Sequence, residues 1–279
     1  MKKLLLALLC LYFVTSNQVY SQASSRNGYW LPTYDTLRVF FVFAEVVNDP
    51  IDTLYNALWA PGEMPETPDI YFDPYFTDAE SINGYMTKYF YEASFGEFIV
   101  LGDYYPNLIQ IEYDSITSTD GDTELLDYLQ DLPSSDIITQ HGFTFNSNDF
   151  DHYVSPTASG QYKTINSDNK IDLMIIVWRL NSKFTTSSNG GQYNSGKAYA
   201  LKEKDYFMSF AKFTSSENLN IEVMRHEIGH GLFGDNSFHT GGSGHGERTF
   251  MSSVGGYSAM SSDEKSSPVY NAWDRYRLG

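Results

Sequence analysis

Cysteine is almost missing from this sequence: among its 279 residues the only one is Cys10. Cys10 lies in an apolar N-terminal stretch that we expect to be removed from the mature protein. A mature chain without cysteine forms no disulfide, offers no thiolate to a metal and has no cysteine nucleophile. Any metal site must therefore be built from His, Asp, Glu or Tyr side chains.

Long hydrophobic runs are also missing. The apolar run at residues 4–14 follows Lys2 and Lys3, and Val19 and Ser21 stand at the positions that a signal peptidase reads. This run is too short for a membrane span, which needs about 20 residues. The pattern is typical of a signal peptide over residues 1–21. We therefore expect a secreted protein, extracellular, periplasmic or at the cell surface, without a membrane anchor.

Positive charge is scarce, since 18 Lys and Arg residues stand against 35 Asp and Glu residues, for a net charge of -17. Such a chain repels nucleic acid and anionic membranes, so neither is an expected partner. The mature part, residues 22–279, is long enough for one large domain. It contains no internal repeat and no low-complexity linker, and we expect a monomer.

Apolar runs and helical periodicity predict the order of the elements. Strands are expected at residues 37–47, 97–101, 108–113, 171–180 and 209–213, and helices at residues 82–94 and 122–132. The uncharged core of residues 171–180 makes that run the best candidate for a central strand, and residues 209–213 suit an edge strand. This order predicts an α+β fold with a mixed sheet.

The most informative helix follows a capping box at residues 214–217. Three apolar residues share one face of this helix: Ile221, Met224 and Ile228. His226 and His230 fall on another face, and Gly231 and Gly234 are expected to end the helix. The domain therefore divides into an N-terminal lobe of about residues 37–234 and an irregular C-terminal lobe of about residues 235–279.

His226, Glu227 and His230 form the pattern H-E-x-x-H. Histidines four residues apart on a helix point the same way, so both rings can bind one zinc ion. Glu227 is then placed to take a proton from water at the ion and to hand it to the leaving amine. A chance match is expected in only about half a percent of chains of this composition, so the pattern indicates a metallohydrolase.

The third metal ligand is less clearly marked. Four residues after the helix could supply it: Asp235, His239, His245 and Glu247. Asp235 stands close to the turn, whereas His239 follows a loop long enough to return to the ion. We therefore favour His239, whose neutral imidazole would match the other two ligands.

On these residues the chain resembles the metzincin clan of zinc peptidases, and most closely the immune inhibitor A-like secreted bacterial proteases. Residues 89–96, 168–172 and 271–279 are similar to segments of those proteases, in addition to the H-E-x-x-H pattern. The resemblance implies a metzincin-like fold, in which backing helices cover a twisted mixed sheet and an active-site helix precedes an irregular lobe. It also implies that the C-terminal lobe is truncated at Gly279.

The chain departs from the metzincin pattern after His230. Phe233 stands at the position of the expected glycine, and Asn236 stands where the third ligand should be. A lengthened loop accounts for both departures and again favours His239. The resemblance further implies a methionine turn beneath the metal, for which Met260 is preferred over Met251.

Two further roles rest on the resemblance. Tyr257 is a candidate to stabilise the transition state as a hydrogen-bond donor, although an ordinary loop tyrosine fits as well. The related proteases bind calcium, and Asn166, Asp168 and Asp172 alternate as calcium ligands do. Lys170 occupies a position where a calcium loop needs oxygen, so a polar turn before a strand is the alternative.

The sequence thus predicts a secreted zinc endopeptidase that cleaves extracellular proteins or peptides. Two alternatives stay open. One is a non-catalytic surface or matrix-binding protein on the same fold, against which the carboxylate of Glu227 argues. The other is a zinc hydrolase of amide or ester bonds in glycans or cell-wall material, because the same water activation serves any acyl carbon.

Overall fold

A computed structural model describes part of the chain. The described residues are 31–50, 59–117, 122–132, 137–143, 148–153, 165–167, 171–179, 192–193, 208–209, 221–233, and the single residues Ala259, Tyr270, Arg275 and Leu278. The expected signal peptide, residues 1–21, lies outside them.

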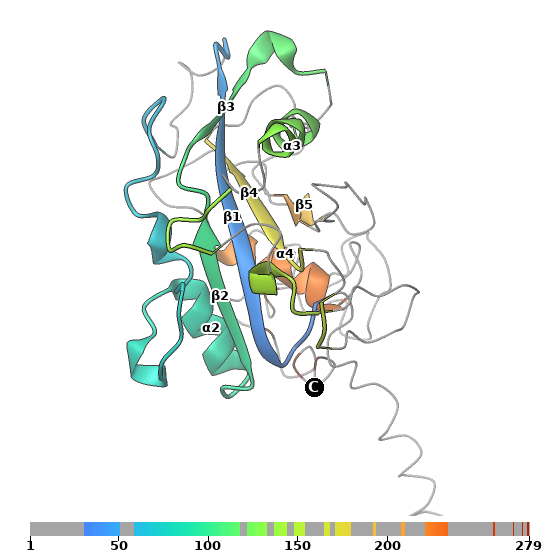
Figure 1. Ribbon diagram of the computed structural model, residues 1–279. Helices are drawn as coiled ribbons and strands as arrows, with labels where there is room; N and C mark the ends of the chain where they lie inside the picture. Colours follow the sequence, from blue (N-terminus) through green and yellow to red (C-terminus); the bar gives the residue numbers. More distant parts are fainter. Residues whose placement is uncertain are drawn as a thin grey trace, which may run out of the picture.

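A long strand, β1, organises the fold (Figure 1). β1 (Asp35–Val47) pairs in parallel with β2 (Phe98–Tyr104), β3 (Ile109–Glu112) and β4 (Met174–Trp178). Tyr105 donates its N–H to the carbonyl of Phe41, and Arg179 donates its N–H to the carbonyl of Ala44. Carbonyls three residues apart on a strand face opposite edges, so β2 and β4 lie on opposite edges of β1.

All three described pairings in the four-stranded sheet are parallel. Most of the expected edge strand at residues 209–213 lies outside the described residues, so the mixed sheet stays a prediction. β1 pairs with three described strands, and β4 pairs with β1. β4 is buried along its whole length, as the apolar run that marked it as a central strand predicts.

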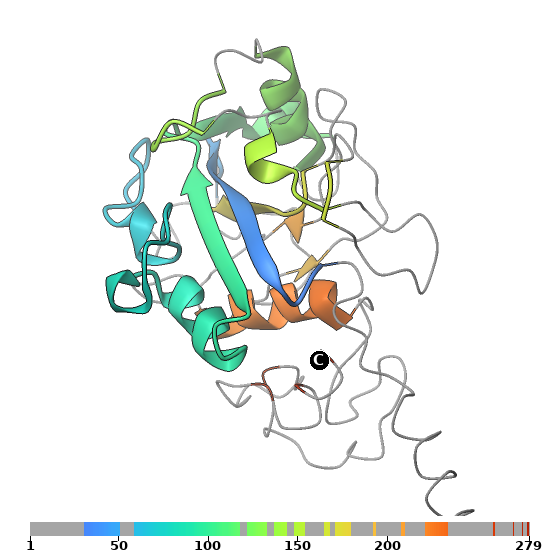
Figure 2. The ribbon, with the colours of Figure 1, turned by 60° about the horizontal axis from the view of Figure 1, so that its bottom comes forward.

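Side chains of β1 and β4 alternate between two apolar cores, as the two-residue period of a strand requires. On one face Val39, Phe41 and Ile175 pack with α2 (Tyr85–Ala93) and α4 (Ile221–Phe233). On the other face Phe40 and Ile176 pack with α3 (Asp122–Asp131). Figure 2 shows α4 running across the direction of β1 and β2, beside α2. Within the described residues the sheet is therefore open, rich in parallel pairs and covered by few helices, which is compatible with the α+β class.

The remaining described elements are short. Four 3-10 helices cover Pro68–Ile70, Ala79–Ser81, Tyr113–Ser115 and Asn148–Phe150. β5 (Gln192–Tyr193) and β6 (Met208–Ser209) form an antiparallel pair. The expected edge strand at residues 209–213 overlaps β6 at Ser209. Within the described residues, no helix combines the length and apolar character that crossing a membrane would need.

A buried ion pair joins the carboxyl ends of β1 and β4. Arg179 Nε lies 3.6 Å from Glu45 Oε2, and the two side chains are 5% and 2% exposed. Arg179 Nε also donates to the carbonyl of Trp59 at 2.8 Å. Glu45 accepts from the side chain of Gln110 and from the N–H of Gly62. The pair therefore ties residues 59–62 and β3 to the two strands.

Candidate metal centre

The candidate ligands stand on α4, as the sequence predicts. The packing of α4 explains why their side chains point away from the apolar core. Met224 and Ile228 are fully buried in the core beneath the sheet. His226 and His230 stand on a different face of the helix, because each residue turns the chain by about 100°. The apolar face thus fixes the helix on the sheet and leaves the histidines together on its other side.

The two histidine rings face each other through the same nitrogen. Nε2 of His226 and Nε2 of His230 are 3.2 Å apart, with the ring planes at 86°. Two nitrogens bound to one tetrahedral zinc ion at about 2.0–2.1 Å would be separated by about 3.3 to 3.4 Å. The observed separation fits that requirement, and the same two atoms can share a proton when no ion is bound.

A carbonyl from the C-terminal part of the chain sets the tautomer of His226. Nδ1 of His226 lies 2.8 Å from the carbonyl oxygen of Ala259. A carbonyl oxygen only accepts, so Nδ1 carries the proton and the Nε2 of the neutral ring presents a lone pair. Metal-binding histidines are typically oriented in this way by a partner on their other nitrogen.

Glu227 completes the group. Its carboxylate and the two rings place one ligand atom each within 4.8 Å of one another. Glu227 is 6% exposed and His230 is 4% exposed, whereas His226 is half-buried. Among the described residues, these three His and Glu side chains lie close enough together to hold one metal ion. The two imidazole nitrogens suit zinc chemically without identifying the metal, and the Glu227 carboxylate lies beside them.

Several predicted site residues lie outside the described part of the chain: the third-ligand candidates Asp235, His239, His245 and Glu247, together with Tyr257, Met251 and Met260. His239 therefore stays a prediction, as do the roles of Tyr257 and Met260. Ala259 is described, and its carbonyl oxygen contacts His226.

The predicted calcium ligands are only partly described. Oδ2 of Asp172 accepts from the N–H groups of His152 and Tyr153, at 2.7 and 3.2 Å. Oδ1 of Asn166 accepts from the N–H of the next residue. The Asn166 contact is that of a polar turn, the Asp172 contacts hold His152 and Tyr153 beside the start of β4, and Asp168 lies outside the described residues. Calcium binding stays a prediction.

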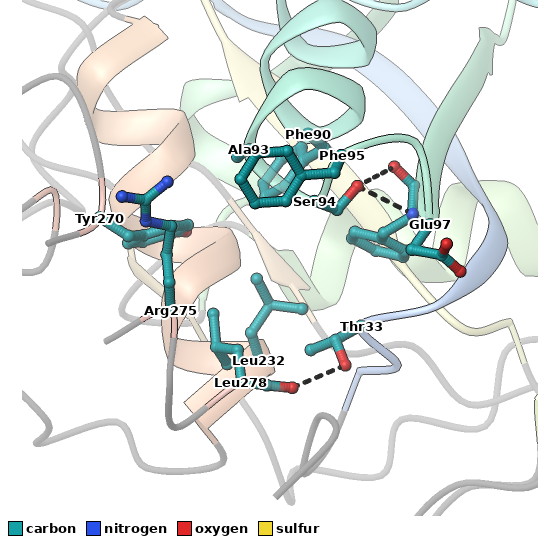
Figure 3. A pocket seen from close by; sticks show the side chains of 11 residues that line it. Thr33, Phe90, Ala93, Ser94, Phe95, Glu97, Leu232, Tyr270, Arg275 and Leu278 are labelled. Carbon is teal, nitrogen blue, oxygen red and sulfur yellow. Dashed lines mark hydrogen bonds between the residues drawn. The ribbon is translucent and has the colours of Figure 1, made fainter. Parts of the chain in front are cut away.

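A cavity of about 350 Å³ lies between α2, α4 and the C-terminal segment (Figure 3). Phe90 of α2, Leu232 of α4, and Tyr270 and Leu278 of the C-terminal segment contribute to its mostly apolar wall. Leu232 comes two residues after His230, so it points about 200° away around the helix. The cavity therefore lies away from the histidine face and is not part of the candidate metal centre.

Two contacts near the site had no signal in the sequence. The carbonyl of Ala259 belongs to the backbone, which every residue carries, so no pattern marks it. Tyr270 donates its hydroxyl to the carbonyl of Arg225, directly before His226, at 2.7 Å. One tyrosine among 22 in the chain could not be singled out without the fold.

Comparison with protein-family models gives no match for this chain, and comparison with curated proteins gives none either. The likeness to metzincins therefore rests on the residues quoted from the sequence.

Proposed function

We propose that this chain is a secreted zinc-dependent endopeptidase with a metzincin-like fold. The observation that carries the proposal is the 3.2 Å separation of the His226 and His230 Nε2 atoms. The proton of His226 is held on Nδ1 by Ala259, and the carboxylate of Glu227 lies within 4.8 Å of the ring nitrogens. A buried histidine pair with a purely structural role would need neither a nitrogen separation that fits a bound zinc ion nor an adjacent carboxylate.

His226 and His230 would hold the metal through Nε2, with His239 as the predicted third ligand. A zinc ion bound there would supply Lewis acidity, which polarises a carbonyl group and lowers the pKa of water. Glu227 would act as general base: its carboxylate takes a proton from the attacking water while the oxygen adds to the scissile carbonyl carbon.

Glu227 would then act as general acid. It returns the proton to the amide nitrogen as the C–N bond breaks, so the products are a carboxylic acid and an amine, between which one further proton passes in water to give a carboxylate and an ammonium group. Neither step needs a covalent bond between the protein and the substrate. This matches the mature chain, which has no cysteine to act as a nucleophile.

The test compares wild type, Glu227→Gln and Glu92→Gln, the last an exposed glutamate on α2 that serves as control. Metal content is measured by elemental analysis, and cleavage of casein and gelatin is measured with and without a chelator. We expect zinc in all three proteins, and chelator-sensitive cleavage in wild type and Glu92→Gln. Glu227→Gln should lose roughly 100- to 10,000-fold in rate, the usual contribution of a general base.

Two outcomes would contradict the proposal. Zinc-loaded wild type that cleaves no protein substrate would favour the binding protein, or, if it released cell-wall or glycan fragments, the alternative hydrolase. Cleavage unchanged in Glu227→Gln would remove Glu227 from the chemistry.

A further inference from the structure

Three hydrogen bonds from distant parts of the chain surround the ligand-bearing turn of α4. The hydroxyl of Tyr270 donates to the carbonyl of Arg225 at 2.7 Å. Nδ1 of His226 donates to the carbonyl of Ala259 at 2.8 Å. The N–H of Leu31 donates to the carbonyl of Gly231 at 3.0 Å. Residues 226–230 are therefore fixed from outside the helix at both ends and at the first ligand.

The sequence of α4 explains why outside contacts matter. Gly229 and Gly231 flank His230 within the helix. Glycine in a helix interior is less favourable than alanine by about 1 kcal/mol, because its backbone loses more freedom. In an α-helix the carbonyl of Arg225 is also the partner of the N–H of Gly229. The Tyr270 hydroxyl thus reinforces the helix at the bond that ends on a glycine.

Tyr270 is itself held firmly. It is 2% exposed, its N–H donates to the hydroxyl of Tyr89 at 3.2 Å, and the two rings pack edge to face at 5.9 Å. The guanidinium group of Arg225 lies over the ring of Tyr89, 4.8 Å from its centre. Figure 3 shows Tyr270 on the cavity wall next to α4. Tyr270 is therefore bonded to α2 through its backbone N–H and to α4 through its hydroxyl.

We propose that Tyr270 is a positioning residue for the metal centre. By holding the carbonyl of Arg225, its hydroxyl fixes the position of α4 and its rotation about the helix axis at the next residue, His226. The His226 ring can then reach Ala259 with Nδ1 and face His230 with Nε2. Tyr270 touches neither metal nor substrate, and this inference rests on the proposed metal site.

The experiment compares Tyr270→Phe with a matched control, Tyr153→Phe. Tyr153 is 1% exposed and its hydroxyl donates to the carbonyl of Tyr34 at 2.8 Å, so each substitution removes one buried hydroxyl bonded to a backbone carbonyl. Zinc affinity is measured by competition with a chelator of known affinity, and the thermal midpoint of each metal-free protein is recorded.

We expect Tyr270→Phe to bind zinc roughly 3- to 10-fold more weakly than wild type, in line with the loss of one hydrogen bond. Tyr153→Phe should bind zinc within a factor of about two of wild type. Its thermal midpoint should nevertheless fall about as far as that of Tyr270→Phe, because each variant loses one buried hydrogen bond. Wild-type zinc affinity in Tyr270→Phe would overturn the proposal, as would an equal loss of affinity in both variants.

A second measurement does not depend on metal. In the metal-free proteins, the nitrogen chemical shifts of His226 report which ring nitrogen carries the proton. We expect the Nδ1–H form in wild type and Tyr153→Phe, and a mixture of both forms in Tyr270→Phe. An unchanged tautomer in Tyr270→Phe would also overturn the proposal. Zinc binding without proteolysis would contradict the proposed peptidase and leave the role of Tyr270 standing.

Discussion

His226 and Ala259, 33 residues apart in the sequence, are joined by a 2.8 Å hydrogen bond from Nδ1 to the carbonyl oxygen. This contact decides the chemistry of His226, because the proton on Nδ1 leaves the lone pair on Nε2. Without it the ring could adopt either tautomer, and only one of them suits a metal. The histidine pair is thus prepared for an ion by a backbone group of the C-terminal part of the chain.

Removal of a ligand should abolish metal binding. His230→Ala takes away one of the two facing nitrogens. Loss of a group that only hydrogen-bonds to a metal ligand typically lowers metal affinity roughly 10- to 100-fold, and we expect the loss of the ligand itself to lower zinc affinity further. The measurement is chelator competition, with His152→Ala as the control, because His152 bonds Asp172 through its backbone N–H, which the substitution keeps. Full zinc affinity in His230→Ala would rule out the paired histidines as ligands.

The third ligand can be tested in the same assay. His239→Ala should weaken zinc binding as strongly as His230→Ala if His239 completes the site. Asp235→Ala, His245→Ala and Glu247→Ala serve as comparisons, because each is an alternative ligand in the sequence. If one of these three loses zinc and His239→Ala keeps it, the third ligand is reassigned accordingly.

The buried ion pair between Arg179 and Glu45 should be sensitive to the loss of one partner. Arg179→Met leaves the Glu45 carboxylate buried without its cation, and we expect the free energy of unfolding to fall by about 3 to 5 kcal/mol. Urea denaturation measures this change. The double variant Arg179→Met/Glu45→Met should recover much of the loss; a double variant less stable than the single one would contradict this account.

The carboxyl group of Asp103 predicts a pH dependence of stability. Burial raises the pKa of Asp103 above its usual value of 3.8, although the hydroxyl of Thr139 and the N–H groups of His141 and Tyr104 donate to it. The folded protein therefore keeps this proton to higher pH than the unfolded chain does. The contribution of Asp103 to stability is present below the unfolded pKa and is lost as pH rises through the folded pKa.

Urea denaturation of wild type and Asp103→Asn from about pH 4 to pH 7 tests this sign. The free energy of unfolding of wild type relative to the variant should decrease as pH rises. Titration of other groups is common to both proteins and cancels in the difference. A relative stability that increases with pH would show that hydrogen bonds outweigh burial at Asp103.

Patterns within short stretches predicted most of the described elements. The expected strand at residues 37–47 is β1, and those at residues 97–101 and 108–113 correspond to β2 and β3. The expected helices at residues 82–94 and 122–132 are α2 and α3. The helical period likewise separated the apolar face of α4 from its histidines, because side chains three or four residues apart lie on the same face of a helix.

The end of α4 shows a limit of such patterns. Gly231 lies inside the helix, which continues to Phe233, although it was expected to help end it. Tertiary contacts, including the bond from Leu31 to the Gly231 carbonyl, outweigh the low helix propensity of glycine.

The sequence by itself determined the facing histidine pair and the adjacent carboxylate, because the geometry of four residues on a helix follows from local bonding alone. The tertiary structure decided that the described strands pair in parallel, that three of them pair with β1, and that Ala259 and Tyr270 reach α4. These contacts join residues dozens of positions apart, and they depend on how all the apolar faces pack together. No local pattern of side chains encodes that outcome.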